Sequence, residues 1–161
     1  MVADPHRPFR ASYLVTGFSR ERIFAALLDV RRFPEWALGL RRVRVLADVK
    51  GETETSEVCP GAALEFTLSA AGLTHRVVGA ITAVEAPHRL EWHYTDGATG
   101  SGSWLLEDAG PSTARLTLST HYRIKPAWLD GIAHRPFFRG LVEDLLRRSI
   151  RRFERYLKDG R

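Results

Sequence analysis

The sequence predicts an α+β domain, in which a curved antiparallel sheet of about seven strands is closed by a long C-terminal helix around an apolar pocket. Three observations favour this class. Apolar and polar residues alternate through most of the chain, turn-forming residues separate the alternating segments, and the C-terminal segment has helical periodicity. A sheet with one apolar face needs a covering layer, and the C-terminal segment is the one long amphipathic helix expected.

The first elements expected are one strand and two short helices. Alternating residues predict a strand over Arg10–Phe18, which ends just before Ser19. Ser19 is a favourable N-cap for a helix over Arg20–Val30. The segment FPEWALGL then indicates a second short helix or turn, with Pro34 in its first turn.

The middle of the chain reads as successive strands in an antiparallel meander. The polar segment Glu52–Val58 is expected to be exposed or at an edge, while the others carry an apolar face. The strands expected after the short helices are Arg41–Val49, Glu52–Val58, Ala62–Ala70, Leu73–Val84, Leu90–Thr95, Gly102–Glu107 and Thr113–Ile124.

The last element expected is a helix over Pro136–Lys158, which is the strongest periodic signal in the sequence. At 100° per residue its apolar side chains and Ser149 share one arc of roughly 140°, and the basic residues fill the opposite arc. The residues of the apolar arc are Phe138, Val142, Leu145, Leu146, Ser149, Ile150, Phe153, Tyr156 and Leu157.

Charge is concentrated on this helix. From Arg139 to Arg161 eight basic residues face four acidic ones, which places +4 of the net charge of +5 there. Such a stripe could meet a membrane surface, but a solvated outer face is the commoner explanation. Since no nucleic-acid motif or interleaved aromatic residues accompany the stripe, nucleic acid is not expected as a partner.

Length and composition fit one domain over residues 1–161, with residues 1–9 as a flexible lead-in. The N-terminal residues resemble no signal peptide, and no apolar run approaches the ~20 residues of a membrane span. The single cysteine, Cys59, permits no internal disulfide and fits a reducing compartment. A cytoplasmic location is therefore expected.

Large side chains on the apolar faces of the strands and of the last helix are expected to line a ligand-binding pocket. The candidate ligand-binding residues are Leu64, Phe66, Arg76, Trp92, Tyr94, Trp104, Tyr122, Phe138, Val142, Leu145 and Ser149. The hydroxyl groups of Tyr94, Tyr122 and Ser149 need partners if they are buried, and either a ligand or another protein group could supply them.

His75 and Arg76 are neighbours on one expected strand, so one of the two must face the pocket. An inward Arg76 would anchor an acidic ligand, whereas an inward His75 could act as a general base. No metal site is expected, because the six histidines form no metal-binding pair and only one cysteine is present. No catalytic constellation or cofactor motif emerges either.

Several segments together resemble the START/polyketide cyclase-like (SRPBCC, Bet v 1-like helix-grip) superfamily. They are SRERIFAALLDVRRFPEW, PGAALEFTLSAAGLTHRVVGAITAVEAPHRLEWHYTDG, GSWLLE and the C-terminal helix. The resemblance spans roughly residues 11–158, and it implies a hydrophobic cavity without fixing the function.

Three functions are compatible with this resemblance. The first is binding of a hydrophobic small molecule, such as a lipid, a polyketide, an aromatic compound or a quinone. The second is a polyketide cyclase/dehydrase-type enzyme that uses Tyr94, Tyr122 or His75 as acid or base. The third is a lipid or quinone carrier at a membrane surface. Whether the chain forms a homodimer is left open.

Overall fold

The protein was analysed as a computed structural model that describes residues 8–47 and 58–160. Across these residues seven strands form one antiparallel sheet in the order β1-β7-β6-β5-β4-β3-β2. The strands are β1 (Phe9–Thr16), β2 (Leu40–Ala47), β3 (Ala63–Ala70), β4 (Leu73–Glu85), β5 (Arg89–Asp96), β6 (Ala98–Asp108) and β7 (Thr113–Ile124). The helices are α1 (Arg20–Leu28), the 3-10 helix η1 (Val30–Glu35), α2 (Ala127–Ala133) and α3 (Pro136–Lys158).

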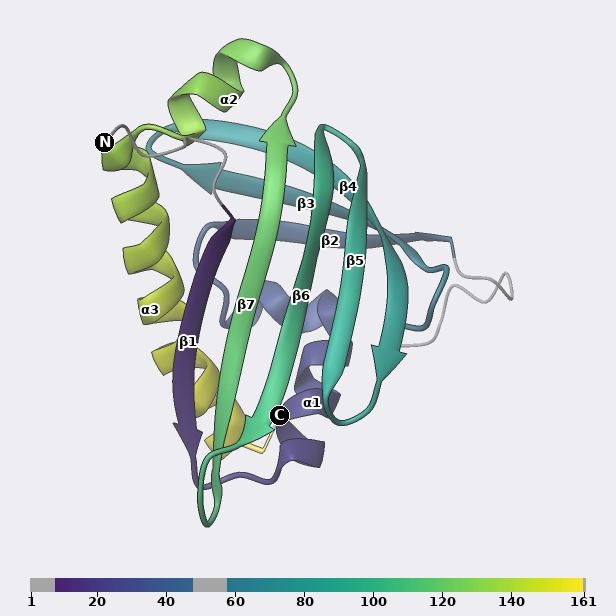
Figure 1. Cartoon of the computed structure of the whole chain (residues 1–161), viewed down its shortest axis with the longest axis vertical. Helices are drawn as coiled ribbons and strands as arrows, with labels where there is room; N and C mark the ends of the chain where they lie inside the picture. The colour runs from purple at the N-terminus through teal and green to yellow at the C-terminus, as the bar shows by residue number, and fades with distance from the viewer. Residues whose placement is uncertain (1–7, 48–57, 161) are drawn as a thin grey trace.

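The sheet is strongly curved. In Figure 1, β1, β7, β6 and β5 stand nearly upright, whereas β2 and β3 cross behind them, and α3 runs down the side next to β1. Register shifts between β4 and β5, at Val78/Gly79 and at Ile81/Ala83, lie where the strands bend. The resulting architecture is the predicted helix-grip fold, with the concave face of the sheet turned toward α3.

The turn between β3 and β4 brings the strands together at one end of the sheet. Ala70 pairs with Leu73, so only Ala71 and Gly72 form the connection. Both residues have positive φ, 51° for Ala71 and 78° for Gly72, which is the backbone geometry of the tight turn that joins twisted strands. This turn becomes one side of the cavity mouth described below.

The C-terminal half of α3 is anchored to η1 and the residue after it, Trp36, by tilted aromatic rings in contact. Trp36 lies between Phe33 and Phe153, with ring centroids 4.9 and 4.6 Å away, and Arg32 lies over the ring of Tyr156 at 5.4 Å. Phe153 is fully buried. Because aromatic rings bury large apolar areas, this cluster fixes one end of α3 against the rest of the fold.

Two expectations need correction or lie outside the described residues, and one helix of the structure was not expected. Phe9 does not belong to a flexible lead-in, because it pairs with Thr120 and is buried; residues 1–7 lie outside the described residues. The predicted strand Glu52–Val58 falls outside it except for Val58, a buried loop residue whose N–H donates to the Leu28 carbonyl at 3.3 Å. The short helix α2 was not predicted.

Candidate functional site

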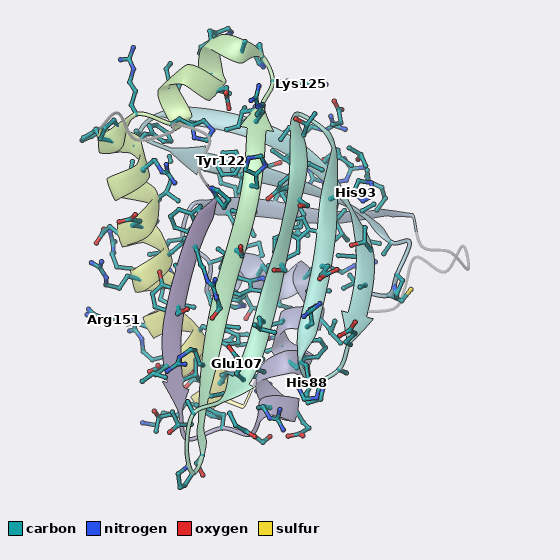
Figure 2. The ribbon with its side chains drawn as sticks, in the orientation of Figure 1. His88, His93, Glu107, Tyr122, Lys125 and Arg151 are labelled. Atoms are coloured by element: carbon teal, nitrogen blue, oxygen red, sulfur yellow. The ribbon has the colours of Figure 1, made fainter. Side chains whose placement is uncertain are left out.

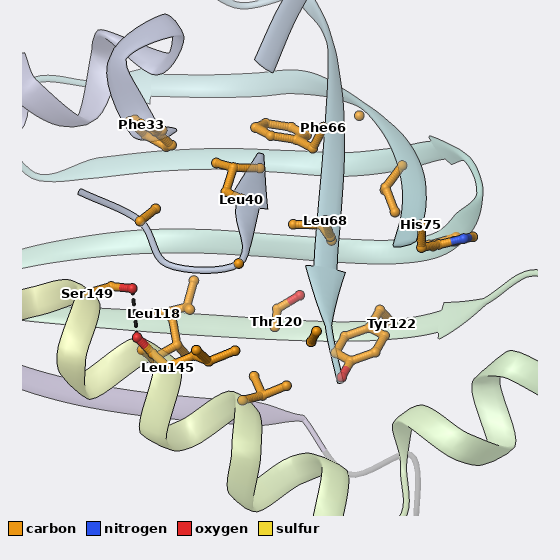
Figure 3. A pocket seen from close by; sticks show the side chains of 18 of the residues that line it. Phe33, Leu40, Phe66, Leu68, His75, Leu118, Thr120, Tyr122, Leu145 and Ser149 are labelled. Carbon is orange, nitrogen blue, oxygen red and sulfur yellow. Dashed lines mark hydrogen bonds between the residues drawn. The ribbon is translucent and has the colours of Figure 1, made fainter. Parts of the chain in front are cut away.

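A cavity of about 400 Å³ lies between the concave face of the sheet and α3. Figure 3 shows it bounded by the strands on one side and by α3 and α2 on the other. Its lining comes from all of the strands except β1, together with η1, α2 and α3. The volume is within the range of small-molecule binding sites, which is roughly 300–1,000 Å³.

One end of the cavity is closed and the other is open. The closed end is lined by side chains that are almost fully buried, including Val30, Trp36, Leu64 and Leu90. At the other end Leu68 on β3 is 43% exposed although it lines the cavity. The mouth therefore lies between the β3–β4 turn and the α2–α3 segment.

Trp92 lies in the cavity wall because its neighbour across the strand pair is a glycine. Trp92 on β5 pairs directly with Gly102 on β6, and a Cβ at Gly102 would collide with the indole ring. Gly102 thus leaves the space in which the ring lies against the sheet. Trp92 is one of the candidates predicted from the sequence, whereas Gly102 is not.

Apart from Ser149, the polar side chains of the cavity lie toward the open end, and two of them are joined by a hydrogen bond. The hydroxyl of Thr120 on β7 donates to the carbonyl of Ser101 at 3.2 Å. Since a hydroxyl has one proton, the hydroxyl of Tyr94 must donate to Thr120, at 2.9 Å. The phenolic oxygen of Tyr94 therefore faces the cavity as a hydrogen-bond acceptor.

His75 has a defined orientation on β4. Its Nε2 lies 2.7 Å from the carbonyl oxygen of Gly97. A carbonyl oxygen only accepts hydrogen bonds, so Nε2 carries a proton and donates. In the neutral ring Nδ1 is then an acceptor, and His75 lines the cavity.

Tyr122 supplies the complementary donor. Burial raises the pKa of its phenol, so the hydroxyl stays protonated at neutral pH. The ring stacks on His134 at a centroid distance of 5.1 Å. Among the residues that the structure describes, the hydroxyl has no hydrogen-bond partner, and Figure 3 shows Tyr122 at the same end of the cavity as His75 and Thr120.

Ser149 has its hydrogen bonds within the protein. Its hydroxyl donates to the Leu145 carbonyl at 2.7 Å and accepts from the Leu38 backbone N–H at 2.8 Å. The side chain is 3% exposed. Its hydroxyl therefore ties α3 to the segment between η1 and β2 and has no free proton to offer a ligand.

Arg76 does not line the cavity, and the expectation that it could anchor an acidic ligand is corrected. Its guanidinium forms ion pairs with Glu65 and, at 3.2 Å, with Asp96. Glu65 also pairs with Arg44 at 3.6 Å, and the hydrogen bond from Arg76 lowers the pKa of the Glu65 carboxyl. These partners lie on the face of the sheet that points away from the cavity, and they hold Arg76 there while His75 faces inward.

The other ten sequence-predicted candidates all line the cavity. They are Leu64, Phe66, Trp92, Tyr94, Trp104, Tyr122, Phe138, Val142, Leu145 and Ser149. Sequence reasoning did not select Thr120, although it shares the apolar face of its strand with Tyr122. It also missed Leu129 and Ala133, because both lie on the unpredicted helix α2.

Within residues 8–47 and 58–160, no three His, Cys, Asp or Glu side chains lie close enough together to bind a metal ion. In the same residues, no helix combines the length and the apolar character that crossing a membrane requires.

The curved antiparallel sheet packs around one long helix and leaves an apolar cavity between them. This arrangement is the helix-grip class of domain. The family described as "Polyketide cyclase / dehydrase and lipid transport" matches residues 11–158, nearly the whole chain. The protein belongs to this family. None of the curated proteins compared with the chain matches it.

Solved structures share the fold at low sequence identity. TTHA0849 from Thermus thermophilus is 14% identical with a TM-score of 0.74, over 95% of this chain and 98% of its own. The Zhui aromatase/cyclase from Streptomyces sp. R1128 is 14% identical with a TM-score of 0.71, covering 94% of this chain and 93% of its own. A START superfamily protein from Mycobacterium smegmatis is 14% identical with a TM-score of 0.69, over 96% and 99%. These similarities establish the fold.

Proposed function

We propose that this protein binds a neutral, largely apolar small molecule that carries a hydroxyl or carbonyl group at one end. The observation that supports this proposal is the composition of the cavity wall. It is apolar along its length, its uncommitted polar groups gather near the mouth, and none of its described lining residues is Arg, Lys, Asp or Glu. The family description, which names polyketide chemistry and lipid transport, agrees with a hydrophobic ligand.

The absence of charged side chains from this described lining favours an uncharged ligand. A carboxylate or ammonium group that is buried without a partner loses its hydration, at a cost of several kcal/mol. Arg76, the neighbour of His75 on β4, is already paired with Glu65 and Asp96 on the other face of the sheet. An acidic ligand would therefore have to leave its charged group outside the mouth.

The three polar groups near the mouth favour a particular orientation of the ligand. Tyr122 offers a proton, whereas Tyr94 and neutral His75 offer acceptor lone pairs. A carbonyl oxygen fits the donor and a hydroxyl proton fits either acceptor. The apolar remainder of the ligand then points toward the closed end, between Trp104 and the apolar side of α3.

Binding of 2-naphthol and of 2-naphthoate tests this proposal, because the two probes share a ring system and differ in charge. We expect 2-naphthol to bind at least about tenfold more tightly, which corresponds to ~1.4 kcal/mol. Tyr122→Phe should weaken 2-naphthol binding severalfold, since it removes the donor and keeps the ring. Equal affinities for the two probes in titration calorimetry would contradict the neutral-ligand proposal.

A blocking variant tests whether the probes occupy the cavity. Val142 lines the cavity on α3, and its neighbour Glu143 is exposed and does not line it. Val142→Trp should abolish 2-naphthol binding, while the matched Glu143→Trp variant should keep it. Native mass spectrometry of the protein purified from its source would then show whether a natural ligand of the proposed kind accompanies it.

A second candidate function, cyclase/dehydrase chemistry, is favoured by His75 and Tyr122 lying at the same end of the cavity. Nδ1 of His75 could take a proton from the carbon next to a carbonyl group, while the Tyr122 hydroxyl polarises the carbonyl oxygen. Incubation with a synthetic poly-β-ketone and mass analysis would detect a cyclised, dehydrated product. If His75→Ala forms this product as fast as the unmodified protein, the enzymatic role has no support.

A further inference from the structure

Two large aromatic side chains project into solvent beside the cavity mouth. Trp128 on α2 is 64% exposed and Phe137 at the start of α3 is 78% exposed. Each directly precedes a residue that lines the cavity, Leu129 and Phe138 respectively. Since consecutive helical residues point about 100° apart, the aromatic pair stands on the outside of the wall whose inside faces the ligand.

The segment that contains both aromatic residues, residues 123–140, carries a net positive charge. Residues 123–140 contain four basic residues and one acidic residue, which gives +3. The acidic residue, Asp130, is turned inward, because it accepts a hydrogen bond from the Ile124 backbone N–H at 2.8 Å and lies 3.1 Å from His134. Lys125 and Arg135 are exposed, so the charge that reaches solvent here is positive.

We propose that this rim, defined as Lys125, Trp128, Arg135 and Phe137, docks the cavity mouth onto an anionic phospholipid bilayer. The inference rests on the proposed function, because it supplies the surface at which a hydrophobic ligand is exchanged. Aromatic side chains enter the headgroup region of a bilayer, and basic side chains are attracted by its negative surface potential. The rim combines both on one short segment.

A bilayer fits this surface better than a folded acidic partner does. Trp128 and Phe137 are both mostly exposed, so most of each ring is available to a partner surface. A fluid lipid surface accepts protruding rings without shape complementarity. The cavity mouth beside them would then open toward an apolar phase, so that the ligand could leave without first being transferred into water. Figure 1 shows α2 and the start of α3 together at one end of the molecule.

The proposal differs from docking through the basic outer face of α3. Arg151 and Arg155 lie on that face, exposed, farther along the helix. Figure 2 shows Arg151 on the outer side of α3, whereas Lys125 lies at the end of the molecule near α2 and Tyr122. The two surfaces can therefore be removed separately by substitution.

Co-sedimentation of the full chain with vesicles of phosphatidylcholine mixed with phosphatidylglycerol tests the inference. The protein should bind these vesicles, bind pure phosphatidylcholine weakly, and lose binding as salt is added. The double variant Trp128→Ala with Phe137→Ala should bind roughly tenfold or more weakly. Lys125→Gln with Arg135→Gln should weaken binding by about fivefold for each charge removed.

The matched control, Arg151→Gln with Arg155→Gln, removes the same charge from the outer face and should bind vesicles nearly as well as the unmodified protein. The inference is overturned if the protein ignores the anionic vesicles, or if the control loses binding while both rim variants keep it. Titration with 2-naphthol separates this outcome from the proposed function, because the rim residues do not line the cavity. Vesicle binding without naphthol binding would refute the proposed function, and the converse would refute the docking surface.

Discussion

Replacing Trp104 by alanine should destabilise the protein and enlarge its cavity. Trp104 on β6 is 8% exposed and lines the cavity near its closed end. Truncation of a buried tryptophan costs about 3–5 kcal/mol, the sum of lost transfer free energy and lost packing. Because one side of this ring already faces open space, fewer packing contacts are lost, and we expect a cost near the lower value.

The expected loss is measurable by thermal and urea denaturation. For a chain of this size each kcal/mol lowers Tm by about 2–4 °C, so a cost of ~3 kcal/mol predicts a decrease of about 6–12 °C. Trp128→Ala is the matched control, because it removes the same side chain from a position that is 64% exposed. A surface substitution of this kind changes the free energy of unfolding by roughly 0.5 kcal/mol or less.

Free indole should restore part of the loss in Trp104→Ala. A ligand that binds only the folded state stabilises it by RT ln(1 + [L]/Kd), which is ~1.4 kcal/mol when free indole is present at ten times Kd. The stabilisation should exceed that of the Trp128→Ala variant, which gains no cavity. If the two variants melt at the same temperature, or if indole does not discriminate between them, the placement of Trp104 in the cavity wall is refuted.

Three further substitutions test other parts of the structure. Ser149→Ala should cost about 1–3 kcal/mol, because the Leu38 N–H loses its acceptor, and should leave 2-naphthol affinity unchanged. Gly102→Ala should push the Trp92 ring toward the cavity, destabilise by roughly 1–3 kcal/mol and weaken 2-naphthol binding; unchanged affinity would contradict this. Since the pKa of Glu65 is lowered, its ion pairs stabilise the fold above the ordinary carboxyl pKa and are lost as pH falls through the lowered value. Glu65→Gln should therefore lose less stability on acidification, as measured by urea unfolding at several pH values.

The bounds of α3 could be predicted from the sequence, whereas α2 could not. Pro136 occupies the first turn and the apolar arc continues to the end of the helix, so Pro136–Lys158 was both predicted and observed. Ala127–Ala133 has only seven residues, too few for a helical period to stand out. Its position depends on packing of Leu129 and Ala133 against the cavity, and that information is absent from the local pattern.

Strand β6 was predicted too short for a different reason. The glycine-rich segment before Gly102 is typical of a turn, but the strand already begins at Ala98. Gly100 has a φ of 115°, and a Cβ there would collide with the His121 carbonyl oxygen, so the two strands approach closely where the sequence indicates a loop. Glycine is common both in turns and where two strands approach closely. Only the pairing of β6 with β7 shows that the second explanation holds here.

The local sequence pattern also could not show whether His75 or Arg76 faces the cavity. Neighbouring residues on a strand point to opposite faces, and the pattern does not say which face is which. The structure separates them through residues that are distant in sequence. Glu65 on β3 and Asp96 at the end of β5 hold the guanidinium on the outer face, and the Gly97 carbonyl accepts from the imidazole. A charged group stays where its partners are, and the sheet order that brings those partners together is a tertiary property.

The apolar arc of α3 has two roles that its periodicity cannot distinguish. Its buried side chains begin at Ser149, and from there to Leu157 they pack against η1 and the sheet. Phe138, Val142 and Leu145 continue the same arc but are only partly buried, because they face the cavity. A hydrophobic pattern shows which side of a helix avoids water. It does not show whether that side contacts the protein core or a ligand cavity. The half of α3 near the mouth therefore has less packing to hold it than the anchored half, and it costs less to displace than that half when a ligand enters.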